Sequence, residues 1–491
     1  MNKASSEVVQ SEDVLSRQEQ RAQPLYAGHV KVYPKSITGR VRRVKWAVLG
    51  ACLAVYYLLP WVRWDRGPDL PNQAVLMDVP NRRFYLFWIE VWPQEIYYLT
   101  ALLIIGAFSL FMATSVGGRV WCGFTCPQTV WTDLFLKIEQ WIEGDRNARV
   151  KFDKQPWTVT KARKKAAKHA IWLLIALLTG GAWIMYFVDA PSLVAGFFTG
   201  ELELVTYFFI ALFTATTYVL AGMAREQVCT YMCPWPRFQA ALLDEDSLVV
   251  TYRDWRGEPR GKHKKGESWD GRGDCIDCKQ CVAVCPTGID IRDGIQLECI
   301  GCGLCIDACD SVMDKVQRPR GLIAFDSERN HRLQTSGQEP VSRLSRLVRP
   351  RTIIYAFLIT GITLAFLTGL AMRSQLDVNV LHDRNPLFVT LSDGSIRNGY
   401  TIRVLNMRQE PRTMTLTVDG VPDAQITLVG AEQAGATSAT LEVEADAVLT
   451  YRVFVAVPSE ALTSNVTDIA FVFDDADAGL HSSHASVFRG P

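Results

Sequence analysis

Residues 275–309 contain CIDCKQCVAVCP and, after a short linker, CIGCGLCIDACD. Each half spaces its cysteines as C-x2-C-x2-C-x3-C, the pattern of bacterial ferredoxins that carry two iron–sulfur clusters. In that pattern, three cysteines of one half bind one cluster and the fourth binds the other. The stretch therefore predicts two [4Fe–4S] clusters, with the ligand sets Cys275, Cys278, Cys281 and Cys309, and Cys299, Cys302, Cys305 and Cys285.

Other uses of eight cysteines fit this stretch less well. Zinc sites take two separated cysteine pairs rather than two runs of four. Disulfides are rare in the reducing compartment that intact clusters need. Pro286 follows the first run as in ferredoxins, whereas Asp310 occupies the corresponding position after the second run. This departure leaves both ligand sets complete.

Composition indicates several domains and gives no sign of nucleic-acid binding. The chain has 491 residues, more than one domain usually holds, and its formal net charge is +1. All 14 tryptophans precede residue 270, and residues 376–491 contain neither cysteine nor tryptophan. Cys52 stands alone in an apolar run, where we expect a small buried side chain.

Five apolar runs are long enough to cross a bilayer as helices. Lysines and arginines near their ends set the expected orientation, because basic loops stay in the cytoplasm. The 119–169 loop carries eleven of them, and the 189–203 loop carries none. We therefore expect a multi-pass protein with its N-terminus and cluster-binding segment in the cytoplasm and its C-terminal part outside. The expected spans are 44–62, 96–116, 170–188, 204–224 and 352–372.

The sequence divides into five parts. Residues 1–40 are polar and predict a flexible cytoplasmic tail, and 41–250 form a membrane domain with the first four spans. Residues 251–330 hold a ferredoxin-like domain, and 331–375 a linker with the fifth span. Residues 376–491 alternate polar and apolar side chains between turn residues, which predicts an immunoglobulin-like sandwich of seven or eight strands. The expected fold class is a five-helix transmembrane bundle with an inserted two-cluster ferredoxin-like domain and a C-terminal all-β sandwich.

Two loops have unusual compositions. The external 63–95 loop contains PNRRFYLFWIEVWPQE. It predicts a segment in the lipid headgroup region, where tryptophan and tyrosine collect. The basic stretch GKHKKG at 261–266 is expected to be a solvated linker or a lipid-headgroup contact.

A second set of cysteines lies at the expected cytoplasmic ends of the second and fourth spans. GRVWCGFTCPQTVW and REQVCTYMCPWPRF each contain C-x3-C-P, with Cys122 and Cys126 in the first and Cys229 and Cys233 in the second. The prolines disfavour helix at the second cysteine of each motif. Four soft sulfurs on one membrane face can bind a soft ion such as Cu(I), cycle between dithiol and disulfide, or bind a further cluster. Whether they form one site or two depends on how the two spans pack.

Other soft ligands lie near the same membrane face. Met112, Met223 and Met232 could add thioether sulfur, although packing in a helical core is the expected role of each. His169 begins the third span beside lysines and is expected at the membrane interface rather than at a metal.

The chain resembles the FixG/CcoG family in a specific combination of features. These are RVWCGFTCPQTVW, VCTYMCPWPRFQ, the double ferredoxin run, five spans and a terminal sandwich. These are polyferredoxin-like accessory proteins of cbb3-type cytochrome c oxidases, and the resemblance covers the chain from about residue 25 onward. It implies an oxidoreductase of the bacterial inner membrane, with a periplasmic C-terminal domain, that reduces Cu(II) to Cu(I) for oxidase assembly. It also implies that the copper-handling residues are Cys122, Cys126, Cys229 and Cys233.

On this interpretation, an unidentified cytoplasmic donor supplies electrons, which pass through the clusters to the four membrane-face cysteines. The expected partners are membrane lipid and either oxidase subunits or copper chaperones. Two other functions stay open. A quinol-linked membrane ferredoxin dehydrogenase subunit would show quinol-dependent cluster reduction without copper. An assembly scaffold with structural clusters would suffer more from deletion of residues 376–491 than from loss of the clusters.

Overall fold

The computed structural model describes residues 31–67, 70–264, 266–373, 376–408, 410–430, 434–462, 464–475 and 480–491. The chain forms two compact units. The first holds the membrane helices and the ferredoxin-like segment up to Thr363, and the second comprises Leu364–Pro491 with Gly67–Leu70. Residues 1–30 of the predicted flexible tail lie outside the described residues.

Five helices in the described residues are long and apolar enough to cross a membrane. Each contains most of one expected span. The third begins earlier than expected, at Val159, because Thr158 accepts a hydrogen bond from the backbone of Lys161 and caps the basic run as helix. The helices are α2 (Arg40–Leu58), which continues through η1 (Leu59–Trp61); α3 (Ile96–Gly117), which follows η2 (Pro93–Glu95); α6 (Val159–Ile184); α8 (Leu204–Thr217), which continues through η4 (Tyr218–Ala224); and α15 (Pro350–Ala371).

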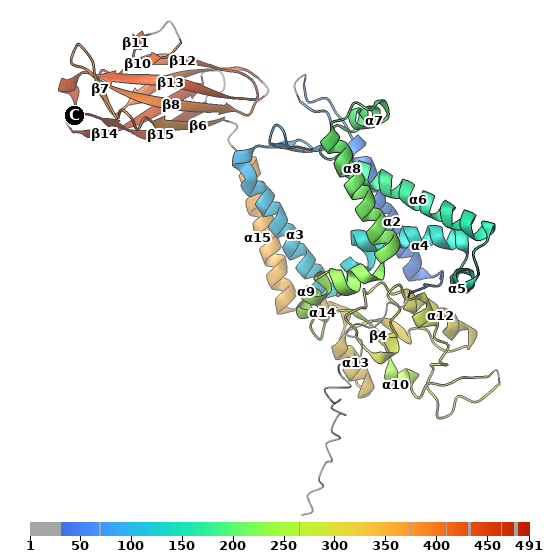
Figure 1. The fold of residues 1–491 in the computed structure, drawn as a ribbon. Coiled ribbons are helices and arrows are strands. Elements are labelled where there is room, and N and C mark those ends of the chain that lie inside the picture. The colour runs from blue at the N-terminus through green and yellow to red at the C-terminus, as the bar shows by residue number, and fades with distance from the viewer. Residues whose placement is uncertain are drawn as a thin grey trace, which may run out of the picture. The chain divides into compact units, whose positions relative to one another are not determined.

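These helices form two groups rather than the single bundle expected from the sequence (Figure 1). In the first group, the hydroxyl of Tyr56 in α2 donates to a backbone carbonyl of α6. A Cβ at Gly180 of α6 would lie 2.8 Å from the backbone nitrogen of Thr214 in α8. In the second group, Tyr355 of α15 contacts Phe108 of α3. None of the apolar window of α15 is buried within the chain, so its surface is left for lipid.

The two loops expected on the outer side of the membrane contain short strands and a short helix. Residues 63–95 include a three-stranded antiparallel sheet of β1 (Val75–Asp78), β2 (Arg83–Leu86) and β3 (Ile89–Val91). Trp88 is 84% exposed and stacks on Trp64, with ring centroids 5.5 Å apart. Exposed indole rings of this kind suit the headgroup region predicted for this loop. The expected 189–203 loop contains a short apolar helix, α7 (Ala190–Thr199).

The 119–169 segment forms two further helices, α4 (Pro127–Glu143) and α5 (Arg146–Lys154), around a buried carboxylate. The side chain of Glu139 is 1% exposed, and its oxygens lie 2.9 Å from Arg149, 3.1 Å from Arg225 and 3.3 Å from Lys168. Burial alone would raise the pKa of Glu139, but these three cations, Arg225 foremost, lower it to about 2. The group therefore stays ionised throughout the physiological range.

Replacing Glu139 with glutamine should destabilise the membrane unit by roughly 3–5 kcal/mol, because Arg149 would stay buried without its counter-ion. An acid with a lowered folded-state pKa contributes stability above its unfolded pKa, here about 4.5, and loses it as the pH falls to about 2. Circular dichroism of thermal unfolding, on the full chain in detergent at several pH values, measures both effects. The control Glu245→Gln removes an exposed carboxylate paired with Arg332 and should leave the midpoint unchanged. Equal losses in the two variants would contradict this account.

Residues 31–39 were predicted as part of a flexible tail, and for this segment the prediction is wrong. The backbone nitrogen of Lys35 donates to the carbonyl of Ala283 in the ferredoxin-like domain at 2.8 Å. The carbonyl of Pro34 accepts a hydrogen bond from the fully buried side chain of Arg149 in α5. Hydrogen bonds to both neighbours hold the segment in place, which explains why it needs no apolar periodicity.

The ferredoxin-like domain is closed by two antiparallel strands, β4 (Val249–Tyr252) and β5 (Ile323–Asp326). Their pairing brings the two ends of the domain together, and Tyr252 and Ile323 line the same cavity as Cys275. The domain follows α9 (Trp235–Leu242). It contains α10 (Asp254–Gly257), α11 (Gln280–Val284), η6 (Ile291–Asp293) and α12 (Leu304–Lys315), and the expected linker after it contains α13 (Glu328–Thr335) and α14 (Arg343–Leu347).

The second unit is a β-sandwich of two antiparallel sheets. In the described residues one sheet has the order β11-β10-β13-β8-β6, with β7 paired to β8, and the other has the order β12-β9-β14-β15. There are more strands than the seven or eight expected, because β7 and β11 are too short to appear as patterns. The strands are β6 (Leu376–His382), β7 (Val389–Thr390), β8 (Ile396–Asn406), β9 (Arg412–Asp419), β10 (Gln425–Leu428), β11 (Ala434–Ala436), β12 (Ser438–Val443), β13 (Ala447–Val457), β14 (Val466–Asp475) and β15 (Leu480–Arg489); η7 (Ser459–Ala461) precedes β14.

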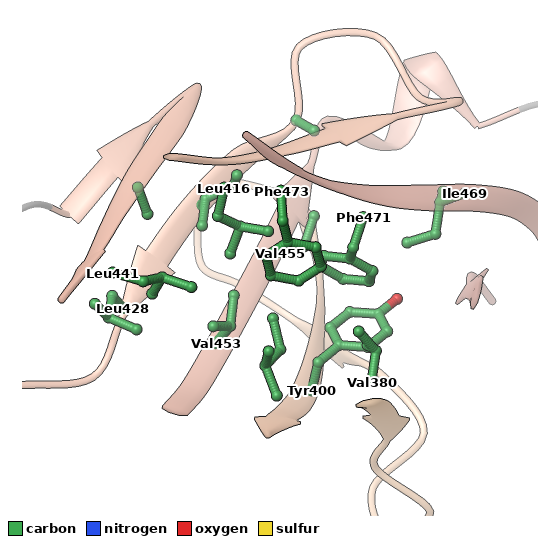
Figure 2. Packing of buried hydrophobic residues seen from close by; sticks show 14 of the residues in the cluster. Val380, Tyr400, Leu416, Leu428, Leu441, Val453, Val455, Ile469, Phe471 and Phe473 are labelled. Carbon is green, nitrogen blue, oxygen red and sulfur yellow. The ribbon is translucent and has the colours of Figure 1, made fainter. Parts of the chain in front are cut away.

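The core of the sandwich lies between these sheets (Figure 2). The rings of Tyr400 and Phe471 meet edge to face with centroids 4.8 Å apart, and both side chains are fully buried. The hydroxyl of Tyr400 donates to the carbonyl of Val487 at 2.8 Å, so its buried polar atom is satisfied. This core is apolar and well packed, which fits a structural or docking role for the unit.

Candidate functional site

The structure brings together the first set of predicted cluster ligands, which we call the first cluster site. Cys275, Cys278, Cys281 and Cys309 line one cavity, which Cys309 reaches from α12. Burial, with the other three thiols close by, raises the pKa of Cys309 to about 12. Four sulfurs around one cavity fit a [4Fe–4S] cluster, in which each iron atom takes one thiolate.

The second set of predicted ligands is also brought together, at what we call the second cluster site. Burial, and then the neighbouring thiols of Cys302, Cys299 and Cys285, raise the pKa of Cys305 well above its usual value. Cys281 of the first cluster site is a further neighbour of Cys305. The two cluster sites are therefore adjacent, as one-electron transfer between them requires.

Asp307 joins the cluster-binding helix α12 to the first membrane helix. It lies two residues from Cys309 and is 6% exposed. Its carboxylate accepts hydrogen bonds from the backbone nitrogens of Val41 at 3.1 Å and Arg42 at 2.7 Å, at the N-terminus of α2. A Cβ at Gly39 would lie 2.2 Å from the Asp307 carboxyl carbon, so only glycine permits this approach. Helix α12, which carries Cys305 and Cys309, is thereby fixed to the end of α2.

The two C-x3-C-P motifs adopt the same local structure. The first cysteine of each lies in a π-helical turn, η3 (Trp121–Thr125) or η5 (Val228–Met232). The backbone nitrogens of Cys126 and Cys233 close these turns by donating hydrogen bonds of 2.9 Å and 2.8 Å to backbone carbonyls at the start of each turn. Both cysteines then have extended ψ angles, 130° and 122°, as residues before proline favour. The predicted opening of the helix at the prolines is confirmed.

The four cysteines of these motifs lie together, and we call them the four-cysteine site. Cys122 interacts electrostatically with Cys126, Cys229 and Cys233, and Cys229 interacts with the last cysteine of each motif. Burial, together with the neighbouring thiols, raises the pKa of Cys122 to about 12 and that of Cys229 to about 11. The ends of the second and fourth spans thus pack so that the two cysteine pairs meet, which the sequence left undecided.

The N-terminus of α4 offers hydrogen bonds to one of these sulfurs. Burial raises the pKa of Cys126, and the backbone N–H groups of Thr129 and Gln128 oppose the rise by donating to its sulfur. The hydroxyl of Thr129 also donates to the carbonyl of Cys122 at 2.6 Å, which ties the turn to the helix. A thiol whose ionised form already has donors nearby is suited to binding a cation.

The four-cysteine site contacts the second cluster site directly. Cys122 and Cys302 belong to one buried apolar cluster, against which Cys229 packs. A Cβ at Gly123 would lie 2.8 Å from the carbonyl oxygen of Gly301, so the two backbones touch. Neither contact includes a ligand of the first cluster site. An electron at the second cluster site is therefore the one closest to the four-cysteine site.

Two side chains that sequence reasoning missed hold this junction together. The guanidinium of Arg119 donates to the carbonyls of Cys299 at 2.8 Å and Pro236 at 3.1 Å, which joins the second cluster site to both motifs. Gln239 is fully buried, and its amide oxygen accepts a hydrogen bond from the thiol of Cys122 at 3.0 Å. An arginine shortly before the first cysteine of both motifs was the available signal for Arg119. Nothing in the sequence marks Gln239.

Other side chains considered from the sequence contribute less. Met223 and Met232 are 62% and 63% exposed, so the core packing expected of them is not found, and Met112 and Cys52 are half-buried. The Nδ1 atom of His169 lies 2.8 Å from the hydroxyl of Tyr218. Among the described residues, no three cysteine, histidine or acidic side chains converge as the ligands of a single ion would. Binding one ion at the four-cysteine site would therefore require side-chain rotation.

Comparisons with known proteins identify the same parts. Family models described as a 4Fe-4S dicluster domain, a 4Fe-4S binding domain and an IG-like fold at the C-terminus of FixG match residues 224–328, 99–148 and 366–491. The nitrogen fixation protein FixG of Rhizobium meliloti is 50% identical over 95% of this chain and 94% of its own length. The chain belongs to the FixG family. It is an iron–sulfur electron-transfer protein, and the resemblance predicted from its cysteine motifs is confirmed.

Two further relatives extend this comparison. Protein RdxA of Cereibacter sphaeroides is 49% identical over 96% of this chain and 99% of its own length. A crystal structure of a FixG-related protein from Vibrio parahaemolyticus is 25% identical, with a TM-score of 0.20, over 24% of this chain and 97% of that one.

The match of residues 224–328 to a dicluster domain supports the two predicted [4Fe–4S] clusters, and the match of 366–491 confirms the immunoglobulin-like sandwich. Family membership and five apolar helices make this a bacterial membrane protein.

Proposed function

We propose that this chain passes single electrons from a cytoplasmic donor through its two cluster sites to the four-cysteine site, where Cu(II) is reduced to Cu(I). The product would serve the assembly of a cbb3-type cytochrome c oxidase, with oxidase subunits or copper chaperones as partners. The cluster sites would face the cytoplasm across the inner membrane, and the β-sandwich the periplasm. The observation that carries the proposal is the direct packing of Cys122 and Gly123 against Gly301 and Cys302.

The residues have separate roles in this scheme. [4Fe–4S] clusters bound at the two cluster sites would each carry one electron at a time. The apolar packing around Cys122 excludes water from the path between the second cluster site and the four-cysteine site. The four sulfurs favour the soft product Cu(I), which assists reduction of Cu(II) there. Burial keeps protons on these thiols in the absence of metal, and metal binding displaces them.

A stoichiometric test separates electrons that come from clusters from electrons that come from thiols. Protein reduced with dithionite and freed of excess reductant is mixed with Cu(II) without oxygen. Two reduced clusters supply two electrons, so about two Cu(I) per chain should form as cluster absorbance returns to the oxidised form. All thiols should remain titratable. Since two thiols can also reduce two Cu(II) by forming a disulfide, loss of thiols with the clusters still reduced would contradict the proposal.

One finding favours a third iron–sulfur cluster, in place of copper, at the four-cysteine site. The 4Fe-4S binding model that matches residues 99–148 includes Cys122 and Cys126, and the four sulfurs do not converge on one point. A third cluster there would make the site a relay rather than the place of copper reduction. Iron analysis distinguishes the two, because two clusters give about eight iron atoms per chain and three give about twelve. Replacing Cys122 and Cys229 with alanine lowers the iron content only in the second case.

A further inference from the structure

The surface around Cys278 is where a cluster comes closest to solvent. Of the eight predicted cluster ligands, Cys278 is the exposed one. Asp277 and Lys279 on either side of it have φ angles of 51° and 52°, a left-handed conformation that is uncommon outside glycine. These two residues turn Cys278 outward. The second cluster site, by contrast, has no exposed ligand and packs against the four-cysteine site, so the first site offers the more accessible edge to an external redox protein.

A structured loop lies beside this exposed cysteine. We call residues 258–264 and 266–272 the lysine loop. The backbone nitrogen of Gly261 donates to the carbonyl of Cys275, a ligand of the first cluster site, at 3.1 Å. The guanidinium of Arg272 donates to the carbonyl of Gly261 at 2.9 Å and holds the two sides of the loop together. The loop is thus fixed next to the cluster rather than being a free linker.

Most carboxylates of the lysine loop and of the adjacent residues 274–277 are paired with cations, whereas three nearby lysines are not. Lys262, Lys264 and Lys279 are exposed and form no ion pair with any residue in the described part of the chain. Among the acidic residues that the structure describes in the lysine loop, Asp270 has no cationic partner, and it accepts a hydrogen bond from Ser268. Among the described residues, three unpaired lysines against one unpaired acid give the loop and Lys279 an excess of positive charge, while Asp277 and Asp290 share the single cation Arg292. The paired groups are Glu258 with Arg260, Glu267 with Arg272, Asp274 with Arg256, and Asp277 with Arg292.

We propose that Lys262, Lys264 and Lys279 dock an acidic one-electron carrier protein, which reduces the cluster held by Cys278. Opposite charge steers such a carrier to the exposed cluster edge and orients it there. One electron leaves the carrier and enters the cluster, with no bond made or broken and no proton transferred. The inference rests on the proposed function in one respect: the electrons that the carrier delivers are those that the four-cysteine site uses.

The position of the lysine loop argues against the lipid-headgroup contact considered from the sequence. In Figure 1 the chain that follows α10 lies at the end of the ferredoxin-like domain away from the membrane helices α6 and α8. A protein in solution can reach that end, and a bilayer crossed by α6 and α8 cannot. The basic surface therefore fits an acidic protein better than anionic lipid.

Rapid mixing tests the docking surface without copper. The full chain in phosphatidylcholine nanodiscs is mixed with reduced plant-type [2Fe–2S] ferredoxin, which is an acidic carrier. The variant Lys262→Glu, Lys264→Glu, Lys279→Glu should be reduced roughly tenfold more slowly than the parent at low ionic strength. The difference should vanish at high salt, where the charges are screened. The control Lys137→Glu, Lys151→Glu, Lys154→Glu makes the same change of charge on exposed lysines of α4 and α5 and should be reduced at the parental rate. Dithionite should reduce the clusters of all three proteins to the same extent.

Three results would overturn the docking proposal. They are equal rates for the parent and the lysine-loop variant at low ionic strength, an equal slowing of the control variant, and a difference that appears only in nanodiscs containing phosphatidylglycerol. The last result would assign the lysines to lipid. This test follows cluster reduction alone, so it fails independently of the proposed function, which is judged by Cu(I) formation from clusters already reduced.

Discussion

Replacing both Cys122 and Cys229 with alanine should abolish copper-dependent reoxidation of the clusters while leaving cluster absorbance and iron content unchanged. These two sulfurs are the first cysteines of the two motifs, and both pack beside the second cluster site. Four-ligand metal sites gain roughly 10–16 kcal/mol from their metal, or about 3 kcal/mol per ligand. Loss of two thiolates should therefore weaken Cu(I) binding by roughly four orders of magnitude, and with it the reduction that this binding favours.

Cys52→Ala is the matched control for this double variant. Cys52 lies in α2 and belongs to neither the ferredoxin run nor the C-x3-C-P motifs, so its loss should leave copper reduction at the parental rate. Reoxidation of the clusters by Cu(II) at the parental rate in the double variant would show that copper is reduced elsewhere. A fall in iron content would instead assign the four cysteines to a third cluster.

Cys302→Ala and Cys278→Ala should each remove one cluster yet differ in their effect on copper reduction. Each variant should lose about half of the iron. Cys302 packs with Cys122 in the buried apolar cluster, so its loss should separate the remaining cluster from the four-cysteine site and stop Cu(I) formation. Cys278 lies at the exposed first cluster site. After dithionite reduction, the Cys278→Ala variant should still yield about one Cu(I) per chain.

The order of the two cluster sites is what this comparison tests. Iron analysis and electron paramagnetic resonance of the reduced proteins verify that one cluster remains in each variant, and Cu(I) is then measured after mixing with Cu(II). If both variants lose Cu(I) formation equally, or if only Cys278→Ala loses it, electrons do not leave through the second cluster site. The contact between Gly123 and Gly301 would then have a structural role only.

Local sequence patterns predicted the parts of this protein that depend on local geometry. The two ferredoxin runs gave the two groups of four cysteines that the structure brings together, including the crossing ligands Cys285 and Cys309. The prolines of the C-x3-C-P motifs predicted an extended backbone at Cys126 and Cys233 because the constraint acts on the neighbouring residue. Apolar length alone placed the five helices.

Features that depend on distant parts of the chain could not be predicted in this way. The two cysteine pairs meet through Arg119 and Gln239, whose partners lie more than a hundred residues away in the sequence. Residues 31–39 are held by scattered hydrogen bonds to α4, α5 and the ferredoxin-like domain, which leave no periodic pattern. Asp310, in the place of the usual proline, accepts a hydrogen bond from the backbone of Gly321 at 2.9 Å, a contact that proline lacks the side chain to make.

The most direct test of the account is single-turnover mixing of the fully reduced chain with Cu(II), with cluster absorbance and Cu(I) followed in the same sample. If electrons pass from the second cluster site through the four-cysteine site to copper, cluster reoxidation and Cu(I) formation should share one rate constant. The Cys122→Ala, Cys229→Ala variant should lose both signals together. Clusters that stay reduced with Cu(II) but are reoxidised by a soluble quinone would contradict copper reduction and indicate a quinone-linked dehydrogenase instead.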